Sequence, residues 1–196
     1  MNNTKQLLID ITFDMLYKRG YCATGLTDIL QSANLTKGAM YYHFKNKNDL
    51  VLSTMQFYLE FMLESHWTKP LAEGEHPINT LTEQIDALYN LYADENAFLM
   101  IKHGCPLNNF IQDMSAKENE FFEYLQDIYG RWQENVEKAL LKAQKSNQTK
   151  TEFQAKDTAL FIVSAIEGSI CSAKANNDLA TLRTSFNVLN HFIKSL

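Results

Sequence analysis

Five polar side chains lie close together in the chain, between residues 37 and 47. Lys37, His43 and Lys47 can carry positive charge, and Tyr41 and Tyr42 carry phenol hydroxyls. Cations and hydroxyl donors are groups with which proteins hold phosphate oxygens. This stretch therefore has the chemistry needed to contact a phosphate backbone, provided that one element presents these side chains together.

The surrounding sequence predicts two short helices joined by a turn. Apolar residues recur at three- and four-residue steps from Leu26 to Ala33, which is the period of an amphipathic helix. Asn34-Leu35 interrupts this pattern, and Thr36 opens a second helical run over residues 37–44. Two short helices joined in this way make a helix-turn-helix, whose second helix can enter a DNA major groove. The alternative is a solvated helical corner that binds nothing.

Side-chain size supports the first interpretation. Met40 and Phe44 are four residues apart and can point inward together. Gly38 and Ala39 lie where a larger side chain would hold the backbone away from DNA, although Gly is intrinsically poor in a helix interior. Their small size predicts a close approach to the groove.

Charge divides the chain into two unequal parts. Residues 1–48 contain six basic and three acidic residues, a net charge of +3, whereas the whole chain carries −5, which leaves −8 for residues 49–196. Only the N-terminal part can approach a polyanion readily, and an acidic protein does not coat nucleic acid indiscriminately. These charges argue against a histone-like or general RNA-binding role.

Composition and length indicate a folded cytoplasmic protein. The chain has 196 residues, of which 45% are hydrophobic, enough to bury a core. No secretory signal is visible at its N-terminus. The most apolar window, residues 155–175, is interrupted by charged residues, which argues against a membrane span. Three cysteines, in a reducing compartment, indicate thiols and not a disulfide framework.

Helical periodicity continues beyond residue 47. We expect an all-α fold of about nine helices, with a helix-turn-helix domain over residues 1–48 and a second helical domain over residues 49–196. The expected helices from residue 47 onward cover residues 47–66, 80–92 and 107–114, then a long helix that follows the Ser115 and Glu118 capping box and runs to about Lys145, and finally residues 153–174 and 178–194.

The first quarter of the chain resembles the DNA-binding domain of the TetR family of transcriptional regulators. The resemblance rests above all on the run TKGAMYYHF, residues 36–44, followed by Lys47. It implies that residues 36–39 begin the recognition helix and face bases or the nearest phosphates, that residues 41–43 contact the backbone, and that Lys47 meets a phosphate. The DNA-contacting set that the resemblance implies is Thr27, Thr36, Lys37, Gly38, Ala39, Tyr41, Tyr42, His43 and Lys47.

The resemblance also implies a homodimer, in which the last two helices pair with their copies. Apolar and small residues of these helices are compatible with such pairing, and the alternative is that they pack within one subunit. A twofold dimer predicts a palindromic operator. The residues considered for pairing are Leu160, Val163, Ala165, Ile166, Gly168, Ile170, Leu182, Phe186, Leu189, Phe192 and Ile193.

Cys105 is the candidate sensor outside the helix-turn-helix. It directly precedes a predicted short helix, whose N-terminal dipole would favour a thiolate, and His103 or Lys102 could add to this effect. The segment from His103 to Ser115 resembles a TetR-like subgroup that contains the N-ethylmaleimide-responsive, electrophile-sensing repressor. In that subgroup Lys174 falls where a lysine can couple with the modified cysteine. The alternative is a cysteine that serves as a small buried hydrophobe.

If Cys105 is inert, we expect a small organic inducer that binds noncovalently in an aromatic pocket. An inducer of either kind would favour an arrangement that no longer fits the operator. The candidate pocket walls, each of which could also be ordinary core, are Phe57, Phe61, Phe98, Phe110, Tyr124, Ile128 and Trp132.

Other classes of protein fit the sequence less well. No phosphate-binding glycine loop, metal-ligand cluster or nucleophile with its base is present, so we expect no cofactor, no metal and no enzyme activity. The alternatives that remain are a thiol-based enzyme and a helical protein-protein adaptor.

Overall fold

The structure is a computed structural model and describes residues 3–196. Every regular element in that range is helical, which confirms the all-α prediction. A π-helical turn, Glu64–Thr68, joins α4 to α5 without a break. If α4 and α5 are counted as one continuous helix, residues 3–196 contain nine helices, as expected. The α-helices are α1 (Asn3–Arg19), α2 (Leu26–Ala33), α3 (Lys37–Tyr41), α4 (Lys47–Leu63), α5 (Lys69–Glu73), α6 (Pro77–Ala93), α7 (Pro106–Met114), α8 (Asn119–Lys145), α9 (Ala155–Asn176) and α10 (Leu179–Ser195).

The chain forms two compact units. The first unit combines the described chain up to Phe61 with Asn109–Gln126, and the second combines Met62–Asn108 with Asp127–Leu196. The boundary between the two compact units therefore does not fall at residue 48. Most of α4 and the segment that joins α7 to α8 belong to the same unit as the N-terminal helices. The functional division at residue 48 stays a prediction.

The first unit has an apolar core built from α1, α2, α3 and the start of α4. Met40 is 0% exposed and Phe44 is 2% exposed, which confirms that both side chains point inward. Burial of such side chains stabilises the small helical arrangement by roughly 1.5–3 kcal/mol each. The core consists of Leu8, Ile9, Met15, Ile29, Leu30, Ala33, Met40, Phe44 and Leu50.

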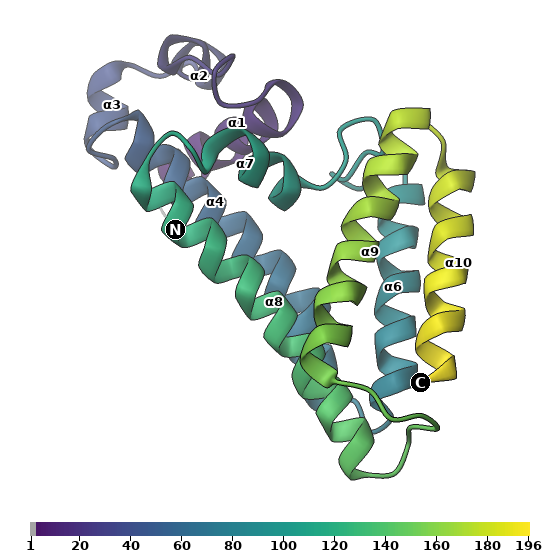
Figure 1. Cartoon of the computed structure of the whole chain (residues 1–196). Helices are drawn as coiled ribbons and strands as arrows, with labels where there is room; N and C mark the ends of the chain where they lie inside the picture. The colour runs from purple at the N-terminus through teal and green to yellow at the C-terminus, as the bar shows by residue number, and fades with distance from the viewer. Residues whose placement is uncertain (1–2) are drawn as a thin grey trace. The chain divides into compact units, whose positions relative to one another are not determined.

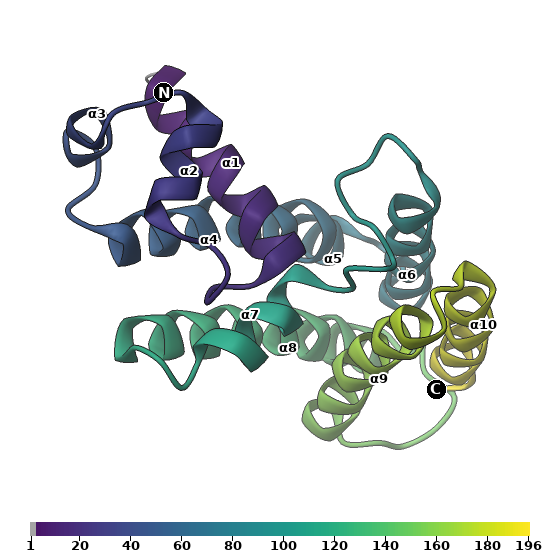
Figure 2. The same cartoon turned by 90° about the horizontal axis from the view of Figure 1, so that it is seen from above.

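In the second unit, α10 packs against both α6 and α9, and the three helices run side by side (Figure 1 and Figure 2). Asp178 begins α10, because its carboxylate accepts hydrogen bonds from the N–H groups of Ala180 and Thr181 at 3.0 and 2.9 Å. Among residues 3–196, α9 alone is long and apolar enough to cross a membrane. Core helices of soluble proteins share that property, and α9 packs its apolar side against α10.

The last two helices bury most of the residues considered above for dimer pairing. Val163 and Ile166 of α9 and Leu182 and Phe186 of α10 are each 0% exposed, because they form the core of one subunit. This corrects their assignment to a dimer surface. The apolar residues that α9 and α10 leave exposed are Leu160, Phe161 and Val188.

Candidate nucleic-acid interface and ligand site

The turn between α2 and α3 is built by local signals. Asn34 adopts the left-handed conformation, with φ at 51°, and its N–H bonds to the end of α2. This conformation suits Asn better than most residues. Thr36 then caps α3, because its hydroxyl accepts a hydrogen bond from the N–H of Ala39 at 3.3 Å. The predicted helix-turn-helix is present, with its second helix ending at Tyr41, three residues earlier than expected.

Most of the predicted DNA-facing side chains are accessible. Thr27, Thr36 and Lys37 are exposed, and Ala39 and His43 are partly exposed. The phenol rings extend furthest from the surface: Tyr41 is 53% exposed and Tyr42 is 82% exposed. The exposed side of α3 therefore offers one ammonium and two phenol hydroxyls to a partner.

Gly38 has no packing reason to be small. A Cβ atom built on Gly38 would meet only the Thr36 hydroxyl, 3.8 Å away, which is an ordinary contact. Because Gly in a helix interior destabilises it by about 1 kcal/mol relative to Ala, its presence calls for another cause. A ligand that approaches the backbone closely, such as DNA, is such a cause.

Lys47 contacts Tyr21 within the first unit. Its Nζ donates a hydrogen bond to the carbonyl of Tyr21 at 3.3 Å and lies 4.0 Å from the centroid of that ring. Burial is the main cause that lowers the pKa of Lys47. In the described conformation the ammonium faces Tyr21, and its predicted contact with a phosphate stays a prediction.

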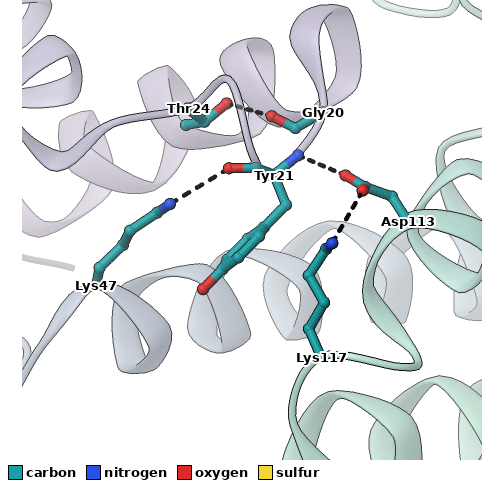
Figure 3. Close-up of polar contacts among 6 residues, drawn as sticks. All are labelled: Gly20, Tyr21, Thr24, Lys47, Asp113 and Lys117. Atoms are coloured by element: carbon teal, nitrogen blue, oxygen red, sulfur yellow. Dashed lines mark hydrogen bonds and ion pairs between the residues drawn. The ribbon is translucent and has the colours of Figure 1, made fainter.

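Tyr21, in the turn between α1 and α2, connects three segments of the first unit (Figure 3). Its N–H donates to Asp113 Oδ2 at 2.6 Å, and its carbonyl accepts the bond from Lys47. Its hydroxyl donates to Asn48 Oδ1 at 2.7 Å. Asp113 also pairs with Lys117, with 3.8 Å between Oδ1 and Nζ. The turn that leads into the helix-turn-helix is thereby held between α4 and the end of α7.

Sequence reasoning missed this Tyr21 cluster. Its one local signal is Gly20, which has a φ of 77° that side chains rarely adopt. A Cβ atom at Gly20 would also lie 3.0 Å from Asp113 Oδ2. The partners on α4 and α7 are 26 to 92 residues away in the chain, beyond the reach of local patterns.

Cys105 precedes α7, as predicted, but its thiol is not acidic. The N–H groups of Leu107 and Asn108 bond to the sulfur and lower its pKa, which is the expected effect of a helix N-terminus. Burial of the sulfur and the charge of Glu167 act in the opposite direction and outweigh them, so the pKa of Cys105 is well above its ordinary value. The neighbouring charge is a carboxylate, not the cation that the sequence suggested, and this corrects the prediction of a favoured thiolate.

Glu167 is the unexpected member of this region. It lies on the buried side of α9 and is 6% exposed. Neither carboxylate oxygen has a hydrogen-bond partner of good geometry among residues 3–196. Burial raises the pKa of Glu167 from 4.5 to about 7, and the approach of Cys105 and Asn108 lowers it by less. Its charge in turn raises the pKa of Tyr129 on α8.

Lys174 lies beside the loop that carries Cys105. A Cβ atom built on Gly104 would lie 2.9 Å from Lys174 Cδ and 3.6 Å from its Nζ. Gly104 has a φ of 76°, so this position favours glycine for two reasons. Lys174 therefore lies next to Gly104, the residue before Cys105, and its coupling with Cys105 stays a prediction.

The seven candidate pocket walls do not form one set. Phe57, Phe61, Phe110 and Tyr124 belong to the first unit, whereas Phe98, Ile128 and Trp132 belong to the second. Phe110 is core, because it is 2% exposed and meets the Phe13 ring edge-on at 6.3 Å. Phe61 is 62% exposed. The two buried residues of the second unit, Ile128 and Trp132, lie four residues apart on α8, and their role in ligand binding stays a prediction.

The other two cysteines, Cys22 and Cys171, are more exposed than Cys105. Cys22 and Cys171 lie in apolar sequence patterns that predict packing residues, but both are exposed, whereas Cys105 has intermediate exposure. Cys22 follows Tyr21 in the turn after α1, and its sulfur accepts a hydrogen bond from Lys117 that raises the pKa of that lysine. Within the described part of the chain, no three His, Cys, Asp or Glu side chains group as metal ligands.

Two protein families match parts of the chain. Residues 8–54 match bacterial regulatory proteins of the tetR family. Residues 77–187, more than half of the chain, match the C-terminal domain of transcriptional regulators that are LmrA/YxaF-like. The two matches correspond to the helix-turn-helix and to most of the second unit.

Full-length relatives are similar over nearly the whole chain. An uncharacterized HTH-type transcriptional regulator in the lacX 3' region of Lactococcus lactis is 27% identical, over 96% of this chain and 92% of that protein. The crystal structure of regulatory protein TetR from Rhodobacter sphaeroides has a TM-score of 0.81 and 22% identity, with 95% of this chain and 96% of that chain covered. Reduced NemR from E. coli has a TM-score of 0.84 and 15% identity, with 96% and 95% covered. Likeness at 15% identity shows the fold alone and does not confirm the predicted electrophile-sensing subgroup.

Proposed function

Because the chain belongs to the TetR family of bacterial regulatory proteins, we propose that it is a cytoplasmic repressor that binds a palindromic operator as a homodimer and is released by a small molecule. The observation that carries the DNA-binding part is the exposed side of α3. It combines Lys37, Tyr41 and Tyr42 with Gly38, whose small size the protein's own packing does not explain. This arrangement suits a helix that enters a major groove and contacts the flanking phosphates.

Tyr42→Ala should weaken operator binding about tenfold without unfolding the protein. Each neutral hydrogen bond contributes about 0.5–1.5 kcal/mol, and a dimer loses two of them. The operator is first selected from a random DNA pool with the purified protein, and affinities are then measured by fluorescence anisotropy at fixed salt. Phe122→Ala is the matched control, because Phe122 is also an exposed aromatic residue, at 47%, but lies on α8. Equal affinity of wild type and Tyr42→Ala would reject the assigned surface, and failure to enrich any sequence would reject DNA recognition itself.

The dimer is proposed to form through the outer sides of α9 and α10. Leu160 and Phe161 of α9 are 52% and 53% exposed, and Val188 of α10 is 68% exposed. The Phe161 ring meets Phe192 of α10 edge-on, with centroids 5.2 Å apart, so the two helices share one apolar surface. An exposed apolar surface of this kind is typical of a protein-protein interface.

The ligand response is proposed to be noncovalent and to involve the second unit. This proposal is supported by the high pKa of Cys105, because the thiolate is the form that reacts with electrophiles. A second candidate, electrophile sensing through Cys105, is favoured by Lys174, which lies beside Gly104, and by the partial exposure of Cys105. The two candidates predict different effects of Cys105 alkylation on operator binding.

We expect N-ethylmaleimide at neutral pH to modify Cys22 before Cys105, because Cys22 is exposed and the Cys105 thiol is held protonated. Mass spectrometry of peptides taken during the reaction gives the order. In parallel, operator binding is followed for wild type and Cys105→Ser. Faster modification of Cys105, with release of DNA that Cys105→Ser prevents, would favour the electrophile sensor over the noncovalent mechanism.

A further inference from the structure

A buried carboxylate that is approached only by a thiol and an amide, neither in good hydrogen-bond geometry, needs an explanation. Transfer of an ionised group from water into the protein interior is strongly unfavourable unless a counter-charge or donors replace the lost water. Glu167 is 6% exposed, and both of its oxygens lack a partner of good geometry within residues 3–196. Groups of this kind are concentrated at functional sites. The missing partner of Glu167 would be a cation or a strong hydrogen-bond donor.

Within residues 3–196, no cationic group is among those that shift the pKa of Glu167. The groups that approach Glu167 are the thiol of Cys105 and the amide of Asn108, both neutral, and the phenol of Tyr129. Cys105 and Tyr129 are the titratable ones; a thiol and a phenol are never cationic, and their raised pKa values keep both neutral at neutral pH. No lysine, arginine or histidine is among the groups that shift the pKa of Glu167.

A row of three aromatic rings begins at Tyr129, which interacts with the carboxylate. Tyr129 on α8 interacts with Glu167, and its ring meets that of Trp132 edge-on, with centroids 6.2 Å apart. Trp132 in turn lies against Trp67, at 5.1 Å between centroids. The indole Nε1 of Trp132 is a second buried polar atom that has no partner in the described part of the chain. A carboxylate close to aromatic rings is a combination that suits organic cations.

Solvent lies within one helical turn of Glu167. Ser164 and Gly168, on the same helix, are exposed, and a Cβ atom on Gly168 would meet nothing within 4 Å. Cys105, which faces the carboxylate, is itself partly exposed. A small molecule that enters from this side would have to displace the side chains that cover the carboxylate, since both of its oxygens are buried.

We propose that Glu167 is the anionic anchor of a ligand site in the second unit. The ligand is a small molecule that carries a protonated amine on an aromatic body. This inference rests on the ligand response proposed above. The amine N–H groups donate to the Glu167 oxygens, and the aromatic body lies toward Tyr129 and Trp132. The ligand is thus a cation, and a neutral molecule of the same shape binds more weakly.

The test compares three arylalkylamines, benzylamine, phenethylamine and tryptamine, with benzyl alcohol, phenethyl alcohol and tryptophol. Binding to the full chain is measured by calorimetry without DNA. We expect wild type to prefer each amine, and Glu167→Gln to weaken amine binding roughly 30-fold, the usual consequence of removing one partner of a buried charge pair. The alcohols should bind Glu167→Gln as they bind wild type. Glu152→Gln, which removes an exposed carboxylate, is the matched control and should keep the amine preference.

Dependence on pH gives a second readout that needs no variant. Glu167 is protonated below its pKa of about 7, so amine affinity should fall as the pH decreases below 7, by up to about tenfold per pH unit. Equal binding of amines and alcohols by wild type, no binding of any amine, or an amine preference that persists in Glu167→Gln would each overturn the proposal. Because no DNA is present, these results are independent of operator recognition. Amine binding that leaves operator affinity unchanged would reject the ligand response and leave the site intact.

Discussion

Val188→Glu should convert the protein into a monomer and weaken operator binding about a thousandfold. Val188 is 68% exposed on α10, beside the apolar surface formed by Leu160 and Phe161. In a twofold interface the new carboxylate would be buried near its own copy, and an unpaired buried charge costs about 4 kcal/mol. That free energy corresponds to roughly a thousandfold in an equilibrium constant. A single helix-turn-helix also contacts only half of a palindrome.

Sedimentation at micromolar concentration and fluorescence anisotropy with the selected operator measure the two effects. Leu141→Glu is the matched control: Leu141 is an apolar residue of α8 that is 38% exposed and lies outside the proposed interface. The control should remain dimeric and bind DNA normally. A dimeric Val188→Glu protein would place the interface elsewhere, and dissociation of the Leu141→Glu protein would indicate an interface that includes α8.

The helix-turn-helix could be predicted because its signals are local. Asn34 takes the left-handed conformation that ends α2, Thr36 caps α3, and Met40 and Phe44 are buried four residues apart. Each of these effects depends on neighbours within four residues in the chain. By contrast, α6 begins at Pro77, not at the predicted Thr80, whose hydroxyl donates back to the carbonyl of His76 instead of capping the helix.

The charges of the candidate sites could not be predicted in the same way. The helix that follows Cys105 is where the sequence places it, and its N–H groups have the expected effect on the thiol. The opposing effect comes first from burial of the sulfur and then from Glu167, 62 residues later in the chain, which sequence reasoning treats only as an interruption of an apolar run. Lys47 is similar, because its partner, the carbonyl of Tyr21, becomes visible only when α4 and the first turn are placed together.

Helices that pack within a subunit and helices that pair between subunits also have the same apolar spacing in the sequence. Val163, Ile166, Leu182 and Phe186 have the apolar spacing that either arrangement requires, and they form the internal core. The exposed set, Leu160, Phe161 and Val188, differs from the buried set only in the side of the helix on which it lies. Which side faces α6 depends on tertiary packing, since α10 packs against both α6 and α9.

Glu167→Gln should stabilise the protein relative to wild type as the pH rises from 4.5 to 7, by about 3 kcal/mol in total. In the unfolded chain the carboxyl of Glu167 loses its proton near its ordinary pKa of 4.5, whereas in the folded protein it holds the proton up to about 7. The folded state therefore binds more protons between these values. Its stabilisation by protonated Glu167 is complete below pH 4.5 and is lost as the pH rises through 7.

Urea unfolding, followed by tryptophan fluorescence, measures this change at several pH values. Trp67 and Trp132 both belong to the second unit with Glu167, so they report on the unit in question. The free energy of unfolding of wild type is subtracted from that of Glu167→Gln at each pH. This difference cancels the titration of other groups, including His66, the pKa of which is lowered by burial. Tyr129 and Cys105, the titratable neighbours, have raised pKa values and stay neutral in this range. A stability difference that does not vary between pH 4.5 and 8 would mean that Glu167 is hydrated in the folded protein, and the case for an unpaired carboxylate at this site would then be lost.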